Sequence, residues 1–528
     1  MTISRIPQIV ERTATRMPDR VALQDRLGGR RVTYQELWAR VRGGAAVLRG
    51  RGLDPGARVL LLMDGSPDWT VALLSILEAD LVAVPLPGAT PIPLVSLAAR
   101  YTGASACVTD TTEHATVLRE HGLSCLASVD LASTIRAGNR VAAADAQGVA
   151  VLAFTSGSTT QPRAVALTHA NVIANLSALL QVRQAAPDEA MLSILPTAHL
   201  YELVAGQLAP LAAGARIVYA GAPMPNRLVD AMRDQAITYA LVVPALVDAL
   251  AREVIERLVG DGAIDSSCRT ARPDDLALTL ERCSPQRRQS VCDQVRHHIG
   301  PSLRTLASGG AAIDPAWTSV LDAVGVTLDV GYGLTEAGPL VAMGSAAGIP
   351  RGSVGRRLPG VDVRIDTTGE ILVMSASVMA GYAGNPALTA EALAGGWLHT
   401  GDRGRLDRDG FLFVDGRIKE AIVTANGDTL YPDEIEPYYA SPLFAESCVV
   451  PMPDACGNDR ATLLVVAAEP GTTDPELTDA FAELRAAAPA RYRVHAMQRL
   501  HAPLPRTALG KIRRRALAES LGRQRMAS

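Results

Sequence analysis

The residues of this chain best suited to chemistry begin with a loop rich in hydroxyl groups and glycine. The segment AFTSGSTTQPRAVALTHANV, residues 153–172, carries six such residues in succession, Thr155, Ser156, Gly157, Ser158, Thr159 and Thr160. Arg163 follows and adds a fixed positive charge. An apolar strand leads into the loop, so backbone N–H groups and hydroxyls converge on one point, as in sites that hold phosphate oxygens. The loop is not a Walker A motif, and on these residues alone a plain surface loop is an equal alternative.

Three later segments place further reactive side chains at strand ends or on turns. GYGLTEAG, residues 331–338, follows the apolar VTLDV and sets an aromatic ring, a hydroxyl and a carboxylate together. LHTGDRGRLDRDGFLFVDGRIKE sets Asp402 after a Thr-Gly turn and Arg417 near its end, and LPRTALGKIRRRAL presents Lys511 on a glycine turn. Taken alone, the tyrosine would more often be a core residue, and each charged residue would more often lie on the surface. Their occurrence together, in this order, favours a nucleotide site.

Taken together, these four segments resemble the adenylate-forming superfamily of acyl-CoA synthetases, luciferases and the adenylation domains of peptide synthetases. The resemblance runs from about Val32 to Lys511, nearly the whole chain. It implies that a carboxylic acid is activated with ATP and Mg²⁺, that pyrophosphate leaves, and that the acyl-adenylate then passes its acyl group to a thiol. Attack on the α-phosphate brings two anions together, so cations and N–H dipoles must be organised where charge develops.

The resemblance assigns phosphate and metal roles to residues of the first two segments. The run Thr155 to Thr159 and Arg163 would hold the β- and γ-phosphates. Thr335 would meet the α-phosphate, and Glu336 would hold Mg²⁺, a hard cation that prefers carboxylate oxygen.

The adenosine moiety is assigned in the same way. Tyr332, with Gly333 beside it, would stack on the adenine. ASGGAA, residues 307–312, would line its other side with three small residues, Gly309, Gly310 and Ala311, which let a base approach the backbone. Asp402 would accept hydrogen bonds from the ribose hydroxyls, with Arg417 nearby.

Two lysines belong to the expected small C-terminal domain. Lys511 resembles the lysine that bridges the substrate carboxylate and the α-phosphate during adenylation. Lys419 falls at the family's hinge position. Rotation about it would take Lys511 out of the site and bring the loop around Gly427 in for the thiol step.

The phosphate loop departs from the family pattern S-G-[ST]-T-G-x-P-K-G. Thr160, Arg163 and Ala164 stand where that pattern has Gly, Lys and Gly. If position 160 required a left-handed backbone, threonine there would cost on the order of 1–2 kcal/mol. Arginine for lysine preserves the charge but not the geometry, which predicts a functional but retuned phosphate grip. Similar loops occur in fatty acyl-AMP ligases, which pass the adenylate to a carrier protein.

The acid is predicted from SILPTAHLYELVAG, with His199 and Glu202. This segment resembles the L-P-x-x-H-x-x-E of long-chain fatty acyl-CoA synthetases, so we expect a fatty acid as substrate and a catalytic, gating role for His199. CoA is the preferred acceptor. The alternatives are an acyl-AMP ligase that loads an acyl carrier protein in trans, an aryl-acid ligase, and a catalytically weakened pseudoenzyme. Only 17 residues follow Lys511, too few for a carrier domain.

Composition is consistent with a large globular enzyme. A chain of 528 residues exceeds one core, and we expect two domains, residues 1–416 and 417–528. A formal charge of −3 gives no field that would attract nucleic acid, so small molecules are the expected partners. Seven cysteines without a C-x-x-C pair indicate reduced thiols, and no export signal is evident, so a cytoplasmic location is expected.

The elements that must position these residues are α/β in character. Apolar strands alternate with helices, which indicates parallel sheets covered on both faces. A helix is expected from Thr33, with the N-cap pair Thr33 and Glu36, to a glycine stop at Gly52. Residues 69–87 contain acidic residues and prolines, so a helix and a buried strand are expected there and no integral membrane segment.

The resemblance implies a large N-terminal domain of two parallel-rich sheets plus a distorted β-barrel, and a small mobile α+β C-terminal domain. Residues 261–294 are polar, contain three cysteines and show little periodicity. They are interpreted as an insertion or a helical excursion without an assigned role.

Overall fold

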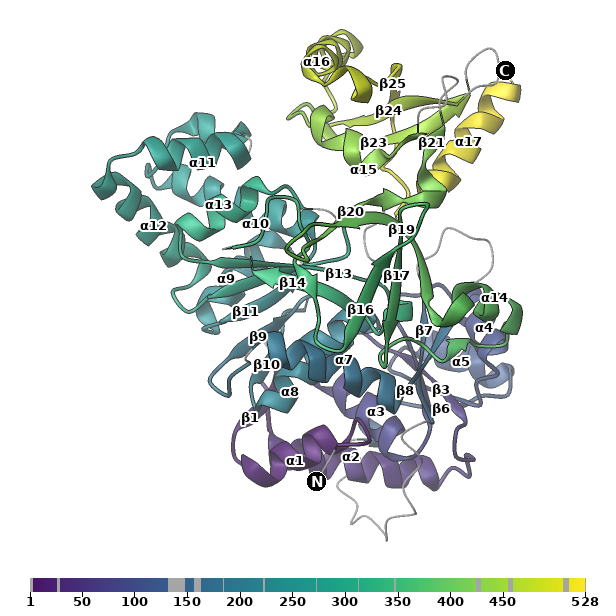
Figure 1. Ribbon diagram of the computed structural model, residues 1–528. Helices are drawn as coiled ribbons and strands as arrows, with labels where there is room; N and C mark the ends of the chain where they lie inside the picture. Colours follow the sequence, from purple (N-terminus) through teal and green to yellow (C-terminus); the bar gives the residue numbers. More distant parts are fainter. Residues whose placement is uncertain are drawn as a thin grey trace.

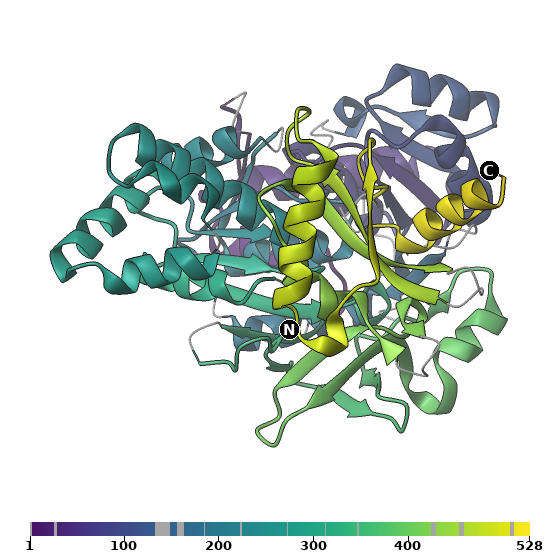
Figure 2. The same cartoon turned by 90° about the horizontal axis from the view of Figure 1, so that it is seen from above.

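The fold is drawn in Figure 1 from a computed structural model. It describes residues 3–25, 29–131, 148–155, 163–183, 185–221, 224–271, 273–311, 313–345, 348–423, 429–453, 459–506 and 512–527. Two large sheets and their helices make up the main body, and the C-terminal residues form a smaller body above it in this view. Figure 2 shows the same arrangement from above, with the C-terminal strands and α16 (Asp474–Ala487) in front of the main body.

The larger sheet has nine strands in the order β15-β14-β13-β12-β11-β9-β10-β1-β2. The strands are β1 (Val21–Asp25), β2 (Arg31–Thr33), β9 (Ala190–Ser193), β10 (Arg216–Tyr219), β11 (Tyr239–Val242), β12 (Thr305–Ser308), β13 (Thr327–Gly333), β14 (Leu340–Ser345) and β15 (Arg356–Arg357). Strands β1, β10, β9, β11, β12 and β13 run parallel, so the carboxyl ends of β11, β12 and β13 lie along one edge. In open parallel sheets, that edge is where ligands bind.

The second sheet has seven strands in the order β18-β8-β7-β4-β3-β5-β6. They are β3 (Arg58–Leu62), β4 (Val82–Leu86), β5 (Ala106–Thr109), β6 (Ser124–Leu126), β7 (Val149–Phe154), β8 (Ala164–Thr168) and β18 (Gly381–Tyr382). Its central strands are parallel and almost wholly buried, as the continuous apolar runs predicted. Strands β7 and β8 instead form an antiparallel hairpin, which the sequence did not indicate.

Helices cover both faces of the two sheets. Those of the main body are α1 (Gln8–Arg16), α2 (Tyr34–Arg49), α3 (Pro67–Glu78), α4 (Ile92–Thr102), α5 (Thr112–Glu120), α6 (Ser128–Leu131), α7 (His169–Val182), η1 (Glu202–Leu208), α8 (Ala209–Ala213), α9 (Pro225–Asp234), α10 (Pro244–Gly260), η2 (Ser266–Thr270), α11 (Pro273–Arg282), α12 (Pro285–Ile299), α13 (Ala316–Ala323), η3 (Thr335–Ala337), α14 (Pro386–Ala392) and η4 (Ala394–Gly396). The largest core lies between the sheets, against α2, α3 and α7. Two smaller cores lie on the outer faces.

The expected distorted barrel is represented by a four-stranded antiparallel sheet in the order β16-β17-β19-β20. It comprises β16 (Val361–Ile365), β17 (Glu370–Ser375), β19 (Leu398–Leu406) and β20 (Leu412–Arg417). A bridge between Arg356 and Phe411 joins it to the edge of the nine-stranded sheet.

The C-terminal residues form an α+β unit with its own cores. Its elements are η5 (Ile418–Glu420), β21 (Ile422–Val423), β22 (Thr429–Leu430), α15 (Pro432–Ile435), η6 (Glu436–Tyr439), β23 (Phe444–Pro453), β24 (Asp459–Ala467), α16, η7 (Ala490–Tyr492), β25 (Ala496–Leu500) and α17 (Arg514–Ala527). Two hydrophobic clusters are built from residues 422–521 alone. The domain boundary at residues 416 and 417 stays a prediction, because the clusters locate packing rather than motion.

Local sequence signals account for several element boundaries. Thr33 caps α2 with the expected box: its backbone N–H donates to Glu36 Oε2 at 2.8 Å, and its hydroxyl accepts from the Glu36 N–H at 3.2 Å. The helix ends at Arg49, with Gly50 as its cap, and not at the predicted Gly52. Residues 261–294 fold as η2, α11 and most of α12, the helical excursion allowed for. Within the described residues, no helix combines the length and the apolar character needed to cross a membrane.

Candidate active site

The predicted phosphate loop is closed at its base by the β7–β8 hairpin. Phe154 pairs with Ala164, and the Thr155 N–H donates to the carbonyl of Arg163 at 3.0 Å. Four predicted phosphate ligands, Ser156, Gly157, Ser158 and Thr159, lie outside the described residues, as does Thr160. The two ends of the loop, Thr155 and Arg163, are half-buried side by side at the carboxyl end of β7.

Arg163 and Glu336 are brought together through Tyr382, a residue that the sequence analysis missed. The Tyr382 hydroxyl donates to Glu336 Oε1 at 2.8 Å, and the Arg163 guanidinium carbon lies 5.9 Å from the centre of the tyrosine ring. Burial raises the pKa of Tyr382, and the Glu336 charge adds to the effect. Tyr382 reaches this position because β18 pairs with β8, two strands more than 200 residues apart in sequence. No local pattern could have indicated that pairing.

Glu336 follows the end of β13 in the short 3₁₀ turn η3, directly after Thr335. The turn requires close backbone packing at Gly333, where a Cβ atom would lie 1.9 Å from the carbonyl oxygen of Pro339. The Met379 N–H donates to the Glu336 carbonyl at 2.9 Å and fixes the turn against the loop before β18. Thr335 and Glu336 are both half-buried.

Glu336 fits the magnesium role that the resemblance implies. Tyr382 engages one of its carboxylate oxygens, which leaves the other for a cation. The described residues contain no group of three or more His, Cys, Asp or Glu side chains arranged to hold a metal ion. Mg²⁺ is commonly bound by one or two carboxylates together with substrate phosphates, and a single carboxylate beside a phosphate loop suits that mode. The assignment of Mg²⁺ to Glu336 stays a prediction.

Tyr332, Asp402 and Arg417 form a second hydrogen-bonded group. The Tyr332 hydroxyl donates to Asp402 Oδ2 at 2.7 Å, and Arg417 Nε donates to Asp402 Oδ1 at 2.8 Å. Asp402 and Arg417 face each other because they are paired residues of β19 and β20. Asp402 is buried, whereas the Arg417 side chain is 47% exposed. The carboxylate raises the pKa of the arginine, and burial raises that of the tyrosine.

The expected adenine-side residues follow β12 at the same sheet edge. Gly309 is buried, and its N–H donates to the Val242 carbonyl at 3.3 Å, at the end of β11. Gly310 has a φ of +87°, a left-handed conformation that glycine adopts without strain. Gly310 and Ala311 are exposed, so their backbone is accessible to a ligand.

Glu202 is the first residue of a rare π-helix, η1, a feature often found at functional sites, and His199 lies three residues before it. His199 Nε2 is buried without a hydrogen-bond partner among the described residues, and burial lowers the pKa of His199 to about 4. Glu202 is fully buried and accepts from the hydroxyl of Ser193 at 2.6 Å and from Gln207 Nε2 at 3.3 Å. Burial raises the pKa of Glu202 to about 7. Because the pKa of His199 lies well below 7, the His199 imidazole is neutral near pH 7.

The two predicted lysines are placed less completely. Lys419 is exposed in η5, two residues after Arg417. Lys511 lies outside the described residues, as does Gly427. The structure thus brings together Arg163 with Glu336, and Tyr332 with Asp402 and Arg417, while it does not show the lysine expected to contact the reacting groups.

An apolar cavity of about 230 Å³ lies on the outer face of the nine-stranded sheet. Its walls come from α9 to α13 and from β12, and they include Leu250, Ala251, Val254, Leu276, Leu280, Val291, Leu306, Trp317 and Val320. Leu306 lies three residues before Gly309 on β12. Ser308, which lies on the same face of that strand as Leu306, has a buried hydroxyl with no hydrogen-bond partner among the described residues. The helices of residues 261–294, left without a role above, form the outer wall.

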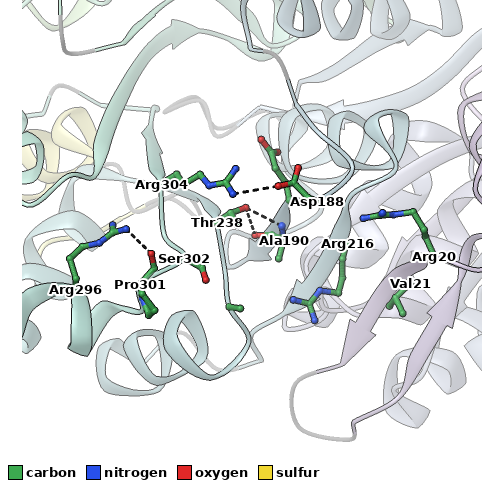
Figure 3. Close-up of a pocket in the computed structure, with 12 residues that line it drawn as sticks. Arg20, Val21, Asp188, Ala190, Arg216, Thr238, Arg296, Pro301, Ser302 and Arg304 are labelled. Atoms are coloured by element: carbon green, nitrogen blue, oxygen red, sulfur yellow. Dashed lines mark hydrogen bonds and ion pairs between the residues drawn. The ribbon is translucent and has the colours of Figure 1, made fainter. Parts of the chain in front are cut away.

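A second, polar cavity of about 580 Å³ opens at the opposite edge of the same sheet (Figure 3). Its lining includes Arg20, Arg216, Arg296 and Arg304. Arg296 Nη2 donates to the Pro301 carbonyl at 2.6 Å, Arg216 Nη2 to the Gln235 carbonyl at 2.7 Å, and Arg304 pairs with Asp188 at 3.4 Å. The Arg216 and Arg304 contacts lie at the starts of neighbouring strands, and the Arg296 contact holds the end of α12 to the loop that follows it, so partners within the chain account for these three arginines without a ligand.

Comparison with known proteins identifies relatives over most of the chain. A family model described as AMP-binding enzyme matches residues 10–383. A feruloyl-CoA synthase of Amycolatopsis sp is 30% identical over 508 residues, covering 92% of this chain and 93% of the relative. A long-chain-fatty-acid–CoA ligase of Mycobacterium tuberculosis is 28% identical over 473 residues, covering 82% and 78%. The anthranilate CoA ligase AuaEII, solved with anthranoyl-AMP, shares the fold with a TM-score of 0.82 at 19% identity, covering 99% and 98% of the two chains.

Proposed function

This chain belongs to the AMP-binding enzymes of the adenylate-forming superfamily and is an AMP-forming CoA ligase, and we propose that its acid substrate is a fatty acid. CoA ligases of this family use ATP, Mg²⁺ and CoA. Its relatives act on both aryl and aliphatic acids by name, so the substrate must be argued from the site.

The observation that carries the proposal is the apolar cavity behind β12. The cavity of about 230 Å³ is smaller than binding pockets for small molecules, which commonly measure about 300–1,000 Å³, so the proposal rests on the lining of the cavity and on its position. Aliphatic side chains dominate its walls, with Trp317 the only aromatic residue among the described lining residues. An alkyl chain suits these walls better than an aromatic ring, because its methylenes can pack against aliphatic side chains and each buried methylene contributes about 0.8 kcal/mol.

The position of the cavity supports the same assignment. Leu306 in its wall and Gly309 at the nucleotide site belong to one short stretch of chain at the carboxyl end of β12. Ser308, between them, offers a buried hydroxyl that a carboxylate or carbonyl oxygen would satisfy. We propose that the alkyl chain occupies the cavity while the carboxylate lies beside Ser308 and Gly309, facing the α-phosphate.

The residue roles in this proposal follow the charges of the two groups described above. Arg163 and the loop before it hold the phosphates, Glu336 holds Mg²⁺, and Asp402 holds the ribose once its bonds to Tyr332 and Arg417 are shared with the sugar hydroxyls. Lys511 neutralises the charge that develops between carboxylate and α-phosphate. Fixed cations and dipoles at these points lower the barrier because they do not have to reorganise during the reaction.

The first test is ATP–pyrophosphate exchange with fatty acids from C6 to C18 and with benzoate and cinnamate, each with and without CoA. Exchange with long-chain acids and formation of the CoA thioester are expected. Exchange confined to the aromatic acids would contradict the proposal.

A variant that fills the cavity gives a sharper version of this test. Ala251 lines the cavity on α10, so Ala251→Phe should abolish exchange with C16 and C18 acids and retain exchange with C6. Arg252→Phe is the matched control, because Arg252 is exposed on the same helix and does not line the cavity. If both variants keep the wild-type preference for chain length, the alkyl chain does not occupy this cavity.

Transfer to an acyl carrier protein is retained as a second candidate because of Thr160, Arg163 and Ala164 in the phosphate loop. That activity predicts exchange with a fatty acid and no thioester when CoA is the only thiol supplied.

A further inference from the structure

The segment that carries Lys511 is anchored at both ends by described residues. Arg506 and Ile512 form an antiparallel bridge, and the Arg513 N–H donates to the Pro505 carbonyl at 2.8 Å. On the entering side, Arg506 Nη2 pairs with Glu446 of β23 at 2.9 Å. The described residues on either side of positions 507–511 are therefore paired with each other and fixed to the C-terminal sheet.

On the leaving side, Arg514 binds three carboxylates at once. Its Nη2 donates to Glu436 Oε2 at 2.7 Å and to Asp433 Oδ1 at 3.0 Å, and its Nε donates to Glu436 Oε1 at 3.2 Å. Its Nη1 donates to Glu420 Oε2 at 3.2 Å. The Arg514 side chain is only 14% exposed, so solvent screens these contacts weakly. The five donors of a planar guanidinium hold several carboxylates in a fixed geometry, whereas the rotatable donors of an ammonium group do not fix it in this way.

Glu420 distinguishes this cluster from an ordinary helix anchor. Glu436 and Asp433 lie in the body of the C-terminal unit, whereas Glu420 is the last residue of η5, next to Lys419 at the expected hinge. Arg417, three residues earlier, is bound to Asp402 of the main body. The ionic contacts thus run from Asp402 to Arg417, along the hinge turn to Glu420, and from Glu420 to Arg514, three residues after Lys511.

If the cluster served stability alone, the free-energy cost of burying its charges would be high for the benefit. Three carboxylates around one arginine leave a net negative charge, and burial raises the pKa of Glu436 although Arg514 opposes the shift. Buried ion pairs are often no more stabilising than apolar packing, and their clearest benefit is a specified geometry.

We propose that Arg514 is a positioning residue: it fixes the described residues that follow Lys511 to the hinge turn Ile418–Glu420, and through them it determines where Lys511 acts when the C-terminal unit rotates. This inference rests on the proposed function, in which Lys511 acts during adenylation. The cluster lies wholly on the C-terminal side of Lys419, so it persists through the rotation and determines where the lysine arrives.

The test compares the two half-reactions in Arg514→Gln. Exchange with ATP should fall about 10- to 100-fold in kcat with little change in the KM for ATP, since misplacement by about 1 Å can cost that much. Thioester formation from supplied acyl-adenylate and CoA should stay close to wild type, because the lysine is then withdrawn. Glu420→Gln should lower exchange in the same direction, and the double variant should be no slower than Arg514→Gln alone. Arg514→Lys should restore exchange only in part.

Arg499→Gln is the matched control, because Arg499 pairs with Asp474 at 2.7 Å in the same unit and contacts no hinge residue among those described. Equal losses in both half-reactions, equal losses in Arg499→Gln, or fully additive losses in the double variant would overturn the inference. If the wild-type protein shows exchange and Arg514→Gln matches it, the inference fails alone. If the wild type shows no exchange with any acid, the proposed function has failed first.

Discussion

At the scale of single residues, Tyr382 orients Glu336, the predicted magnesium ligand. A hydroxyl donor on one carboxylate oxygen holds the group in one orientation, and no hydrogen bond from a described residue engages the second oxygen. The cation–π contact with Arg163 couples the same tyrosine to the phosphate loop. A single ring therefore connects the two predicted ligands of the ATP–magnesium complex.

Removal of that hydroxyl tests the connection. In Tyr382→Phe, we expect exchange to fall about tenfold and half-saturation to require more Mg²⁺, because a hydrogen bond to a charged group contributes about 1.5–3 kcal/mol. Titration of Mg²⁺ in the exchange assay measures both effects. Tyr101→Phe is the control: its hydroxyl donates to the carbonyl of Ala383, the residue after Tyr382, at 3.0 Å. An unchanged Mg²⁺ requirement in Tyr382→Phe would remove Tyr382 from the metal site.

Glu202 carries a pH-dependent cost. Its folded pKa of about 7 lies above its ordinary value of 4.5, so the folded protein holds a proton that the unfolded chain releases between those pH values. Stability contributed by this group consequently falls as pH rises from about 4.5 to 7 and is lowest above 7. Glu202→Gln removes the cost, and its advantage over wild type in unfolding free energy should be larger at pH 8 than at pH 5 by about 2 kcal/mol. Thermal or denaturant unfolding at the two pH values measures it, and a pH-independent difference would show that Glu202 titrates normally.

At the scale of elements, the sequence predicted most of what local patterns control. The capping box of α2, the α3–β4 pair and the buried parallel strands follow from residue spacing, and the structure has them. The β7–β8 hairpin and its pairing with β18 were not predicted, because register between distant strands depends on tertiary packing and leaves no local signal. The candidate site shows the same division. Asp402 and Arg417 were predicted from sequence motifs, whereas their pairing across β19 and β20 and the contacts of Tyr382 could be seen only in the structure.

The helices α11 and α12 illustrate the limit of periodicity. No residue of α11 is fully buried, and only Val291, Cys292 and Ile299 of α12 are. Their apolar residues lie at the margin of the outer core and also line the apolar cavity, so few of them are buried and the hydrophobic stripe is thin. A segment at the margin of a core has fewer buried positions to reveal its period than a segment in the middle of one.

At the scale of the whole molecule, the hydrophobic cores divide at the predicted hinge. Leu463 is fully buried in a C-terminal core, and Leu60 is fully buried in a core of the seven-stranded sheet. Separate cores allow separate unfolding, since multidomain proteins commonly depart from two-state behaviour. We expect two calorimetric transitions. Leu463→Ala should lower the temperature of one transition, and Leu60→Ala that of the other. Each variant should lower the unfolding free energy of its own unit by about 2–5 kcal/mol. A single transition shifted by both variants would show that the two units unfold as one.

The two ionic contacts that flank Lys419 also define where this chain can be recombined with a relative. Arg417 pairs backward with Asp402, and Glu420 pairs forward with Arg514. A crossover placed before Arg417 or after Glu420 would join partners from different parents across one of these contacts. Only a crossover at Ile418 or Lys419 keeps both pairs within a single parent. A chimera that exchanges the C-terminal unit should therefore be joined within these two residues.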